Sequence, residues 1–269
     1  MCVKNFFTLQ LLFFILIFAA IQNAGCVPAS SFTFENGDWY DNFGINRNYY
    51  GGPYGFLPNL IYETIGENKE LAYSIGEKFR EKYTSMTERG VAILRYVQRL
   101  TDYGYDSENV VIKGVPQEEW AWNADEMAHN FSEVTGVRAV GDCEDFAFLC
   151  GTIYLAAGFD VAIVEAPEHA ALLIWLPEFP NANVYWDLPN DGRDAGWIWV
   201  ESTGDSNPLG WTPPDFEDGG WTAYVINISG STPETVPYEP TSIDLEFLLA
   251  IVFIILSIMS ALTKSKSKR

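Results

Sequence analysis

A cysteine flanked by acidic residues stands at the start of an apolar segment, "VGDCEDFAFLCGTIYLAAGF", residues 140–159. Asp142, with Asp145 three residues later, has the spacing of a capping box, which makes Cys143 the first residue of a helix. Free backbone N–H groups and the positive end of the helix dipole favour a thiolate at such a position. The thiol also falls on the apolar side of the helix, so we expect it to face a sheet rather than solvent.

The carboxylates on either side of this cysteine oppose thiolate formation, because like charges repel. We therefore expect Asp142 and Asp145 to fix the helix start rather than to activate the sulfur, and we expect Glu144 to be solvated. Cys150, seven residues after Cys143 on the same helix, is too far away for a disulfide bond. It is interpreted as an inert core residue.

A nucleophilic thiol needs a base, and the chain contains only two histidines. His169 follows the turn "APE" and opens the apolar segment "HAALLIWL", so a return of the chain after the helix would bring it over the helix start. His129, in the segment before the cysteine, is the alternative. We predict that His169 is the partner of Cys143.

A third group should orient the imidazole ring. Glu201, at the end of "GWIWVEST", would present a carboxylate to the ring from a neighbouring antiparallel strand, and Asp187 in "NVYWDL" is the competitor. An oxyanion hole would use the backbone N–H of Cys143 and one upstream donor. The residue types and positions leave four candidates for that donor open: Gln117, Trp120, Trp122 and Asn123.

The elements that must position these residues change type along the chain. Apolar residues at helical spacing predict helices over 68–83 and 84–103, with Thr84 or Ser85 as a cap, a short helix over 124–134 and the helix over 142–158. Short β-branched or aromatic segments predict strands over 160–166, 169–176, 183–188 and 196–203. Helices followed by strands indicate an α+β fold, in which N-terminal helices pack on an antiparallel sheet. Residues 104–122 and 30–60 are expected to be irregular.

Three segments together resemble the transglutaminase-like core, a group of papain-like cysteine enzymes found in many archaeal and bacterial proteins. They are "GDCEDFAFLCGTIYLAAGFDVAIV", "APEHAALLIW" and "WIWVESTGDSNPLGW", and the match covers roughly residues 85–212. The resemblance implies a papain-like fold with Cys143 as nucleophile, His169 as base and Glu201 as orienting group. Most relatives have aspartate in place of Glu201, and the insertion between His169 and Glu201 is long, which leaves Asp187 open as the third member.

The two ends of the chain differ from its middle. Residues 1–29 are an apolar run with one lysine, which indicates a signal peptide or an N-terminal anchor, and Cys26 is a poor lipidation site. Residues 244–263 are long and apolar enough to predict a transmembrane helix, and the basic tail 264–269 predicts a cytoplasmic C-terminus. These features predict a single-pass membrane protein, or a two-pass one if the N-terminal segment is uncleaved, with an extracellular domain.

The resulting organisation has an N-terminal arm and helix over 30–84, the core over 85–212 and an acidic, proline-rich wrap and stalk over 213–243. The part outside the two ends contains 11 basic against 34 acidic residues, a net charge of −23. Such a charge disfavours binding to nucleic acid. It fits a soluble domain in a salty or exposed setting, and the protein or peptide substrate is what the family resemblance implies.

We therefore expect a surface-tethered cysteine hydrolase (peptidase or amidase) or a transglutaminase, acting on amides through a thioester acyl-enzyme. The alternative is a non-catalytic ectodomain of the same fold that acts as a binding or scaffold module. No cofactor is expected. The two histidines are far apart and no close cysteine pair exists, so no zinc-type spacing predicts a metal site.

Overall fold

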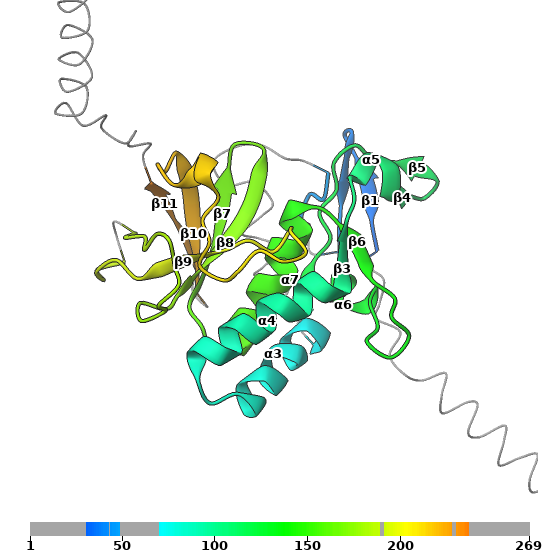
Figure 1. The fold of residues 1–269 in the computed structure, drawn as a ribbon. Helices are drawn as coiled ribbons and strands as arrows, with labels where there is room; N and C mark the ends of the chain where they lie inside the picture. Colours follow the sequence, from blue (N-terminus) through cyan, green and yellow to red (C-terminus); the bar gives the residue numbers. More distant parts are fainter. Residues whose placement is uncertain (1–30, 43, 49–69, 189–190, 228–229, 237–269) are drawn as a thin grey trace, which may run out of the picture.

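The computed structural model describes residues 31–42, 44–48, 70–188, 191–227 and 230–236. A five-stranded sheet forms one side of the molecule, in the order β11-β10-β7-β8-β9, with every neighbouring pair antiparallel (Figure 1). The strands are β7 (Val161–Ala166), β8 (His169–Trp175), β9 (Trp197–Val200), β10 (Trp221–Asn227) and β11 (Gly230–Val236). The predicted α+β class with an antiparallel sheet is confirmed.

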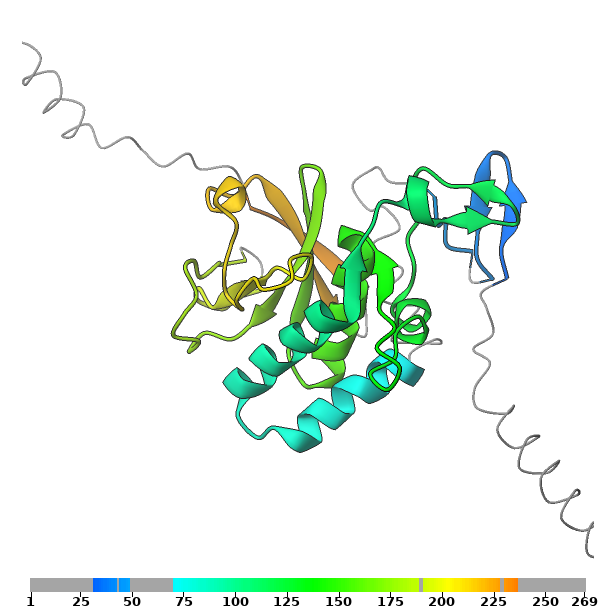
Figure 2. The same ribbon diagram turned by 45° about the vertical axis from the view of Figure 1, so that its right-hand side comes forward.

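Four helices account for the other side: α3 (Glu70–Lys82), α4 (Met86–Leu100), α6 (Ala124–His129) and α7 (Cys143–Ala156). Figures 1 and 2 show α7 between the sheet and the outer pair α3 and α4. Ser85 caps α4, because its hydroxyl oxygen accepts the Glu88 N–H at 3.3 Å. Gly158 follows α7 with φ +90°, the left-handed conformation that glycine adopts after a helix. All four helices lie in segments that the sequence predicts to be helical.

Each face of the sheet carries its own apolar core. On the α7 side, Phe146, Leu149 and Ile153 pack with Leu172 and Ile198 of the strands, all of them almost completely buried. Each large apolar side chain buried in this way contributes about 1.5–3 kcal/mol relative to an exposed one. The opposite face is aromatic and is lined by tryptophans 186, 197, 199 and 221. Because both faces are covered, β8 is a buried central strand and its first residue occupies a well-fixed position.

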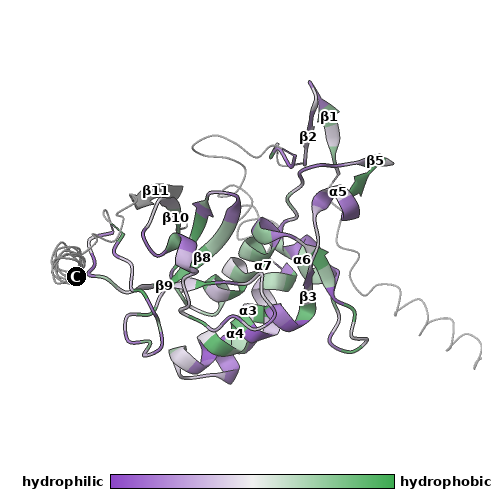
Figure 3. Ribbon diagram, turned by 45° about the horizontal axis from the view of Figure 1, so that its top comes forward, coloured by the Kyte–Doolittle hydropathy of each residue, from purple (hydrophilic) through white to green (hydrophobic). Residues whose placement is uncertain are grey.

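Smaller elements gather at the end of the molecule away from the sheet (Figures 1 and 2). They are the hairpin β1 (Thr33–Glu35) and β2 (Asp38–Tyr40), the one-turn helix α5 (Asp106–Asn109), the hairpin β4 (Val111–Ile112) and β5 (Val115–Pro116), and the parallel pair β3 (Thr101–Tyr103) and β6 (Ala139–Gly141). In Figure 3, α5 is purple because its residues are polar. The described parts of 30–60 and 104–122 thus contain more regular structure than the sequence predicts. Hairpins this short contain too few residues to show the alternating hydrophobic pattern of a strand.

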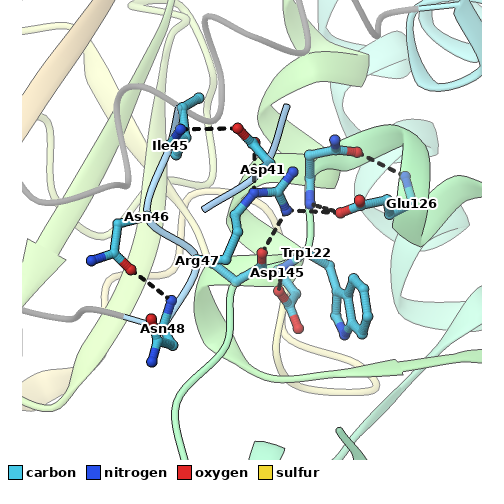
Figure 4. Close-up of polar contacts among 10 residues, drawn as sticks. Asp41, Ile45, Asn46, Arg47, Asn48, Trp122, Glu126 and Asp145 are labelled. Carbon is cyan, nitrogen blue, oxygen red and sulfur yellow. Dashed lines mark hydrogen bonds and ion pairs between the residues drawn. The ribbon is translucent and has the colours of Figure 1, made fainter. Parts of the chain in front are cut away.

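A buried arginine ties the N-terminal arm to the helical part. Arg47, 0% exposed, bonds to Asp41 through Nε at 2.9 Å and to Glu126 of α6 through Nη1 at 2.8 Å (Figure 4). Its Nη1 also donates to the carbonyl oxygen of Ala121, and its own carbonyl accepts the Ala121 N–H. The arm is therefore part of the folded unit, and its contacts reach the segment just before α6.

Two predictions about the β part are wrong. Residues 183–188 form no strand; Trp186 makes only an isolated bridge with Trp197, so this segment is a loop that covers the aromatic face. The wrap predicted over 213–243 contains the short 3₁₀ helix η1 (Pro214–Phe216), then the interior strand β10 and the edge strand β11. The glycines and prolines around these strands obscure their alternating pattern, and the strands are ordered by pairing: β10 pairs with β7, and β11 pairs with β10.

The predicted terminal segments 1–29 and 244–263 lie outside the described residues. Within the described ranges, no helix is both long and apolar enough to cross a membrane.

Candidate active site

The first turn of α7 is held by two neighbouring contacts. Asp145 Oδ2 accepts the backbone N–H of Asp142 at 3.2 Å, which is the reciprocal bond of the capping box that the sequence predicts. Asp145 Oδ1 accepts the N–H of Trp122 at 2.7 Å, so this carboxyl group also joins the helix start to the segment before α6 (Figure 4). Cys143 is the first residue of the helix, as predicted.

The thiol lies in a largely buried place among acidic groups. Cys143 Sγ donates to Glu144 Oε2 at 3.3 Å, and the backbone N–H of Ala170 in β8 lies close enough to favour the thiolate. The pKa of the thiol is nevertheless raised, first by burial and then by the charges of Glu144 and Asp142. Glu144 is only 2% exposed, so the prediction that it is solvated is wrong. Its place one residue after the cysteine turns its side chain inward, toward the β3–β6 side.

A tight turn sets the position of the histidine. Ala166 of β7 pairs with His169 of β8, so Pro167 and Glu168 alone make the connection, and Glu168 has φ +56°. The β8–β9 ladder ends at Leu172 and Val200, which leaves Ala170 beyond it. The sulfur therefore lies beside the residue that directly follows His169, at the open end of β8.

His169 and Glu201 form a direct pair, with 2.9 Å between Nε2 and Oε2. Glu201 is 3% exposed and follows the last residue of β9. Burial raises the pKa of Glu201, but the hydrogen bond and charge of His169 and the donors on Thr203 and Trp199 outweigh burial, so the pKa is lowered. Trp199 Nε1 donates to Oε2 at 3.2 Å, and the Thr203 backbone N–H donates to Oε1 at 3.2 Å. The carboxylate is thus held as an anion.

Aromatic stacking fixes the imidazole from the side. The rings of His169 and Phe216 are parallel within 4°, with centroids 5.5 Å apart, and Phe216 stacks in turn on Trp199. Since Nε2 is engaged by Glu201, Nδ1 is the nitrogen that can take the proton of the thiol.

The expected contact between sulfur and imidazole is not made in this arrangement. Among the described residues, the hydrogen bond of the thiol goes to Glu144 and not to the His169 ring. Side chains alternate along a strand, so His169 shares its face with Ala171 and Leu173 of the aromatic core, whereas α7 covers the other face. The ring must reach around the end of β8 to meet the sulfur. Catalytic hydrogen bonds are often long in the absence of substrate.

The alternative residues are placed elsewhere. His129 is an exposed residue at the end of α6, and Asp187 is exposed in the 183–188 loop. Cys150 is completely buried in the core against the sheet, as predicted. Glu201 rather than Asp187 is therefore the carboxylate that contacts His169.

Of the four candidates for the second oxyanion donor, three have side chains or N–H groups in structural bonds. The Gln117 amide donates to the Val115 carbonyl, the Asn123 side chain caps α6, and the Trp122 N–H bonds to Asp145. The Trp120 indole N–H is buried and, among the described residues, has no hydrogen-bond partner. Trp120 remains the open candidate.

Sequence reasoning missed several residues around the site. Trp199 and Thr203 flank Glu201 at a spacing of two, a pattern that places all three side chains on one face of a strand and its extension. Phe216 carried no signal, because its approach to His169 depends on a loop. Asp106 and Glu119 also converge on the start of α7, and each comes from a segment with weak periodicity.

Comparison with known proteins gives no further assignment: the chain matches no family model, no curated protein and no solved structure.

Proposed function

We propose that this protein is a cysteine hydrolase or acyltransferase of the transglutaminase-like class, with Cys143 as nucleophile and His169–Glu201 as the base and its orienting group. The single observation that carries the proposal is the 2.9 Å pair between His169 Nε2 and a buried, anionic Glu201. A carboxylate with donors on both oxygens, one of them an imidazole, is the arrangement that orients a base and stabilises an imidazolium. The Cys143 sulfur lies beside the backbone N–H of Ala170, the residue that follows His169 in β8, although it bonds to Glu144 in this arrangement.

The reaction proceeds in two stages. His169 Nδ1 takes the thiol proton as the Cys143 sulfur bonds to the carbonyl carbon of an amide, and the negative charge passes to the carbonyl oxygen. Collapse of this intermediate breaks the C–N bond, and the imidazolium returns its proton to the leaving amine. Water then attacks the thioester and releases an acid, or an amine attacks it and forms a new amide. In both cases the C–S bond breaks and the thiol is restored.

The helix start and Glu201 supply the electrostatics of this scheme. The Cys143 N–H, at the positive end of α7, is directed to the place where the oxyanion develops. Glu201 stabilises the positive charge that appears on His169 during the transfer. The protein or peptide substrate, the papain-like core and the anchoring of the domain outside the cell by the C-terminal segment belong to the same proposal.

One observation favours the second candidate, a non-catalytic binding module. The thiol has a raised pKa and donates to Glu144, so in this arrangement it is neutral and its proton is not on the path to His169. In a binding module the thiol would stay neutral and bonded to Glu144. In an enzyme the substrate would displace the Glu144 contact and free the thiol to transfer its proton to His169.

Alkylation by a peptidyl vinyl sulfone distinguishes the two candidates. We expect modification at Cys143, mapped by mass spectrometry, and none at the buried Cys150. A general base contributes about 10²–10⁴-fold, so His169→Ala should slow the modification by that factor, while His129→Ala, a change of the other histidine, should leave the rate unaltered. Equal, slow modification in the wild type and in both histidine variants would refute the enzymatic proposal and support the binding module.

A further inference from the structure

Five carboxyl groups lie beside the first turn of α7, and the Cys143 sulfur forms a close set with two of them, Asp142 and Glu144. Asp142, Glu144 and Asp145 come from the helix start, and Asp106 and Glu119 come from the segment between β3 and α6. Their oxygen atoms form two overlapping sets, Asp106 with Asp142 and Asp145, and Asp106 with Glu119 and Glu144. Within each set the atoms all lie within 4.8 Å of one another.

Several of these oxygen atoms have no donor. Asp106 Oδ2 accepts the Trp120 N–H at 2.6 Å, but Asp106 Oδ1, Asp142 Oδ1 and Glu144 Oε1 are buried and, within the described part of the chain, lack any hydrogen-bond partner. Asp106 and Glu144 are each only 2% exposed. Leaving a buried polar group unpaired costs about 1–3 kcal/mol, and more for a charged one. Asp106 and Glu144 belong to one of these close sets, and unpaired buried oxygens in such a set point to a positively charged group between them.

The basic side chains of the described residues do not supply that group. Arg138 pairs with Asp102 and Asp205, and the Lys113 ammonium donates to a backbone carbonyl. None of the ion pairs found within the described ranges includes a member of the five-carboxyl cluster. The charges that act on these carboxyls are mainly those of one another, and Asp142 and Glu144 can bond to each other only while one of them is protonated.

We propose that Asp106, Glu119, Asp142, Glu144 and Asp145 bind a hard divalent cation, with Ca²⁺ as the best fit. Ca²⁺ takes carboxylate oxygens at about 2.3–2.6 Å, so two of its ligands lie up to about 5 Å apart, which matches the oxygen separations of the cluster. Its tolerance of irregular geometry suits ligands from three separate segments of the chain better than the octahedral demand of Mg²⁺ does. Glu119 is exposed, which gives the ion a route from solvent.

The site differs from the zinc-type arrangements that the sequence analysis considered, because it uses carboxylates and no histidine. Its ligands join the segment that holds α5 to the start of α7, so the bound ion would fasten the first turn of the cysteine helix. The inference stands on the cluster alone and does not depend on the chemistry of Cys143.

Binding is tested on the full chain with Ca²⁺ and with Tb³⁺, a luminescent ion of similar size. We expect about 5 mM Ca²⁺, above the range of weak extracellular sites, to raise the unfolding temperature by several degrees over the value in EDTA. Tb³⁺ bound near Trp120 should luminesce on indole excitation, and Ca²⁺ should displace it.

Two variants and one control make the test specific. Asp106→Asn keeps an oxygen for the Trp120 N–H but removes a charge, and Glu144→Gln does the same at the helix; each should weaken Ca²⁺ binding at least tenfold. Glu118→Gln removes the charge of the exposed neighbour of Glu119 and should leave binding unchanged. The site is refuted if Ca²⁺ alters neither unfolding nor Tb³⁺ luminescence of the wild type, or if Glu118→Gln weakens binding as much as Asp106→Asn. A larger response to Mg²⁺ than to Ca²⁺ would overturn the choice of ion.

Discussion

Two groups of buried acids lie near Cys143, and they behave in opposite ways. Glu201, 3% exposed, receives donors from His169, Trp199 and Thr203, and its pKa is lowered. Asp106 is equally buried at 2% exposed, and burial together with the charge of Asp142 raises its pKa to about 8, although it accepts one backbone N–H. Burial is common to both. The neighbours decide the direction of the shift: the imidazole of His169 favours the anion at Glu201, whereas nearby acids favour the protonated form at Asp106 and at Asp145, although Asp145 accepts two backbone N–H bonds.

The difference separates two roles around one thiol. The Glu201 side is complete within the chain and holds a charge that can stabilise an imidazolium. Among the described residues, the acidic cluster lacks donors and basic partners for several of its oxygens, so protons or a cation are needed to stabilise it. Changes on the Glu201 side should therefore alter reactivity, and changes on the cluster side should alter stability and its dependence on pH and ions.

The largest effect is expected from Cys143→Ala, because no other group can form the acyl-enzyme. Incorporation of a fluorescent amine into a protein substrate, and hydrolysis of the same amide, should fall to background, about 10⁶-fold in a comparable nucleophile–base unit. Cys150→Ala, a change of the buried cysteine, should retain the activity. Substantial turnover by Cys143→Ala would contradict the assignment of the nucleophile.

Within the pair, His169→Ala should cost nearly as much as Cys143→Ala, and Glu201→Gln should be milder by about two powers of ten. The amide oxygen of glutamine still accepts a hydrogen bond from the ring, but the charge that stabilises imidazolium is lost. Single-turnover rates of the two variants and of the double variant check this. Losses that simply add in the double variant would show that the two residues do not act as one unit.

The cluster predicts a decline of stability at alkaline pH when a chelator is present. The pKa is raised by burial first and by neighbouring acids next, to about 7 for Glu144, about 8 for Asp106 and about 9 for Asp142. The unfolded chain releases these protons near pH 4, so the folded protein binds more protons between pH 4 and 9 and the free energy of unfolding falls as the pH rises.

As the pH rises, we expect the free energy of unfolding to fall by about 1–3 kcal/mol for each of these buried groups. Glu119, Cys143 and Tyr103 also face the cluster. Denaturant unfolding in EDTA at several pH values between 5 and 9.5 measures it. The lowered pKa of Glu201 acts in the opposite direction and only on the acid side, as its stabilisation is lost when the pH falls. Stability that stays constant up to pH 9.5 would contradict the raised pKa values.

The smallest effect is expected from Asp187→Asn. Asp187 is exposed and lies in a loop, whereas Glu201 contacts the imidazole, so activity and unfolding temperature should change by no more than the usual ±0.5 kcal/mol of a surface substitution. Parallel assays of Asp187→Asn and Glu201→Gln measure the contrast. A larger loss in Asp187→Asn than in Glu201→Gln would reverse the choice of the orienting residue.

The helices and the central strands could be predicted from the sequence, because each is long enough to show its period. Asp142 and Asp145 predict the start of α7, and Gly158 predicts its end. The contact of His169 with Glu201 also followed from order along the chain, since consecutive strands tend to be neighbours, and β8 and β9 pair despite the long connection between them. Segment 221–236 was misassigned because its strands are ordered by pairing rather than by their own composition. Segment 183–188 has the composition of a strand but makes only the isolated bridge of Trp186 with Trp197.

The acidic cluster could not be predicted, for a different physical reason. Asp106 lies 36 residues before Asp142 in the sequence, and acids are so frequent in this chain that their convergence leaves no pattern. The inward turn of Glu144 depends on the parallel pairing of β3 with β6, which places Gly141 beside Tyr103. The direction of the His169 side chain similarly depends on the register of β8, which a one-residue shift would reverse.

The buried contacts of Arg47 also determine when the N-terminal arm can join the rest of the fold during synthesis. Its partner Glu126 is 79 residues further along the chain, so a ribosome that adds about 5–20 residues each second makes it on the order of ten seconds later. During that interval the arm has emerged but has no helical part to join. Once the 121–126 segment and Asp145 have both been made, Arg47 can bind that segment and Trp122 can bind Asp145, which holds the start of α7 (Figure 4). The arm is thus synthesised well before its partners, and it can join the fold only after the segment that supports the cysteine helix has been made.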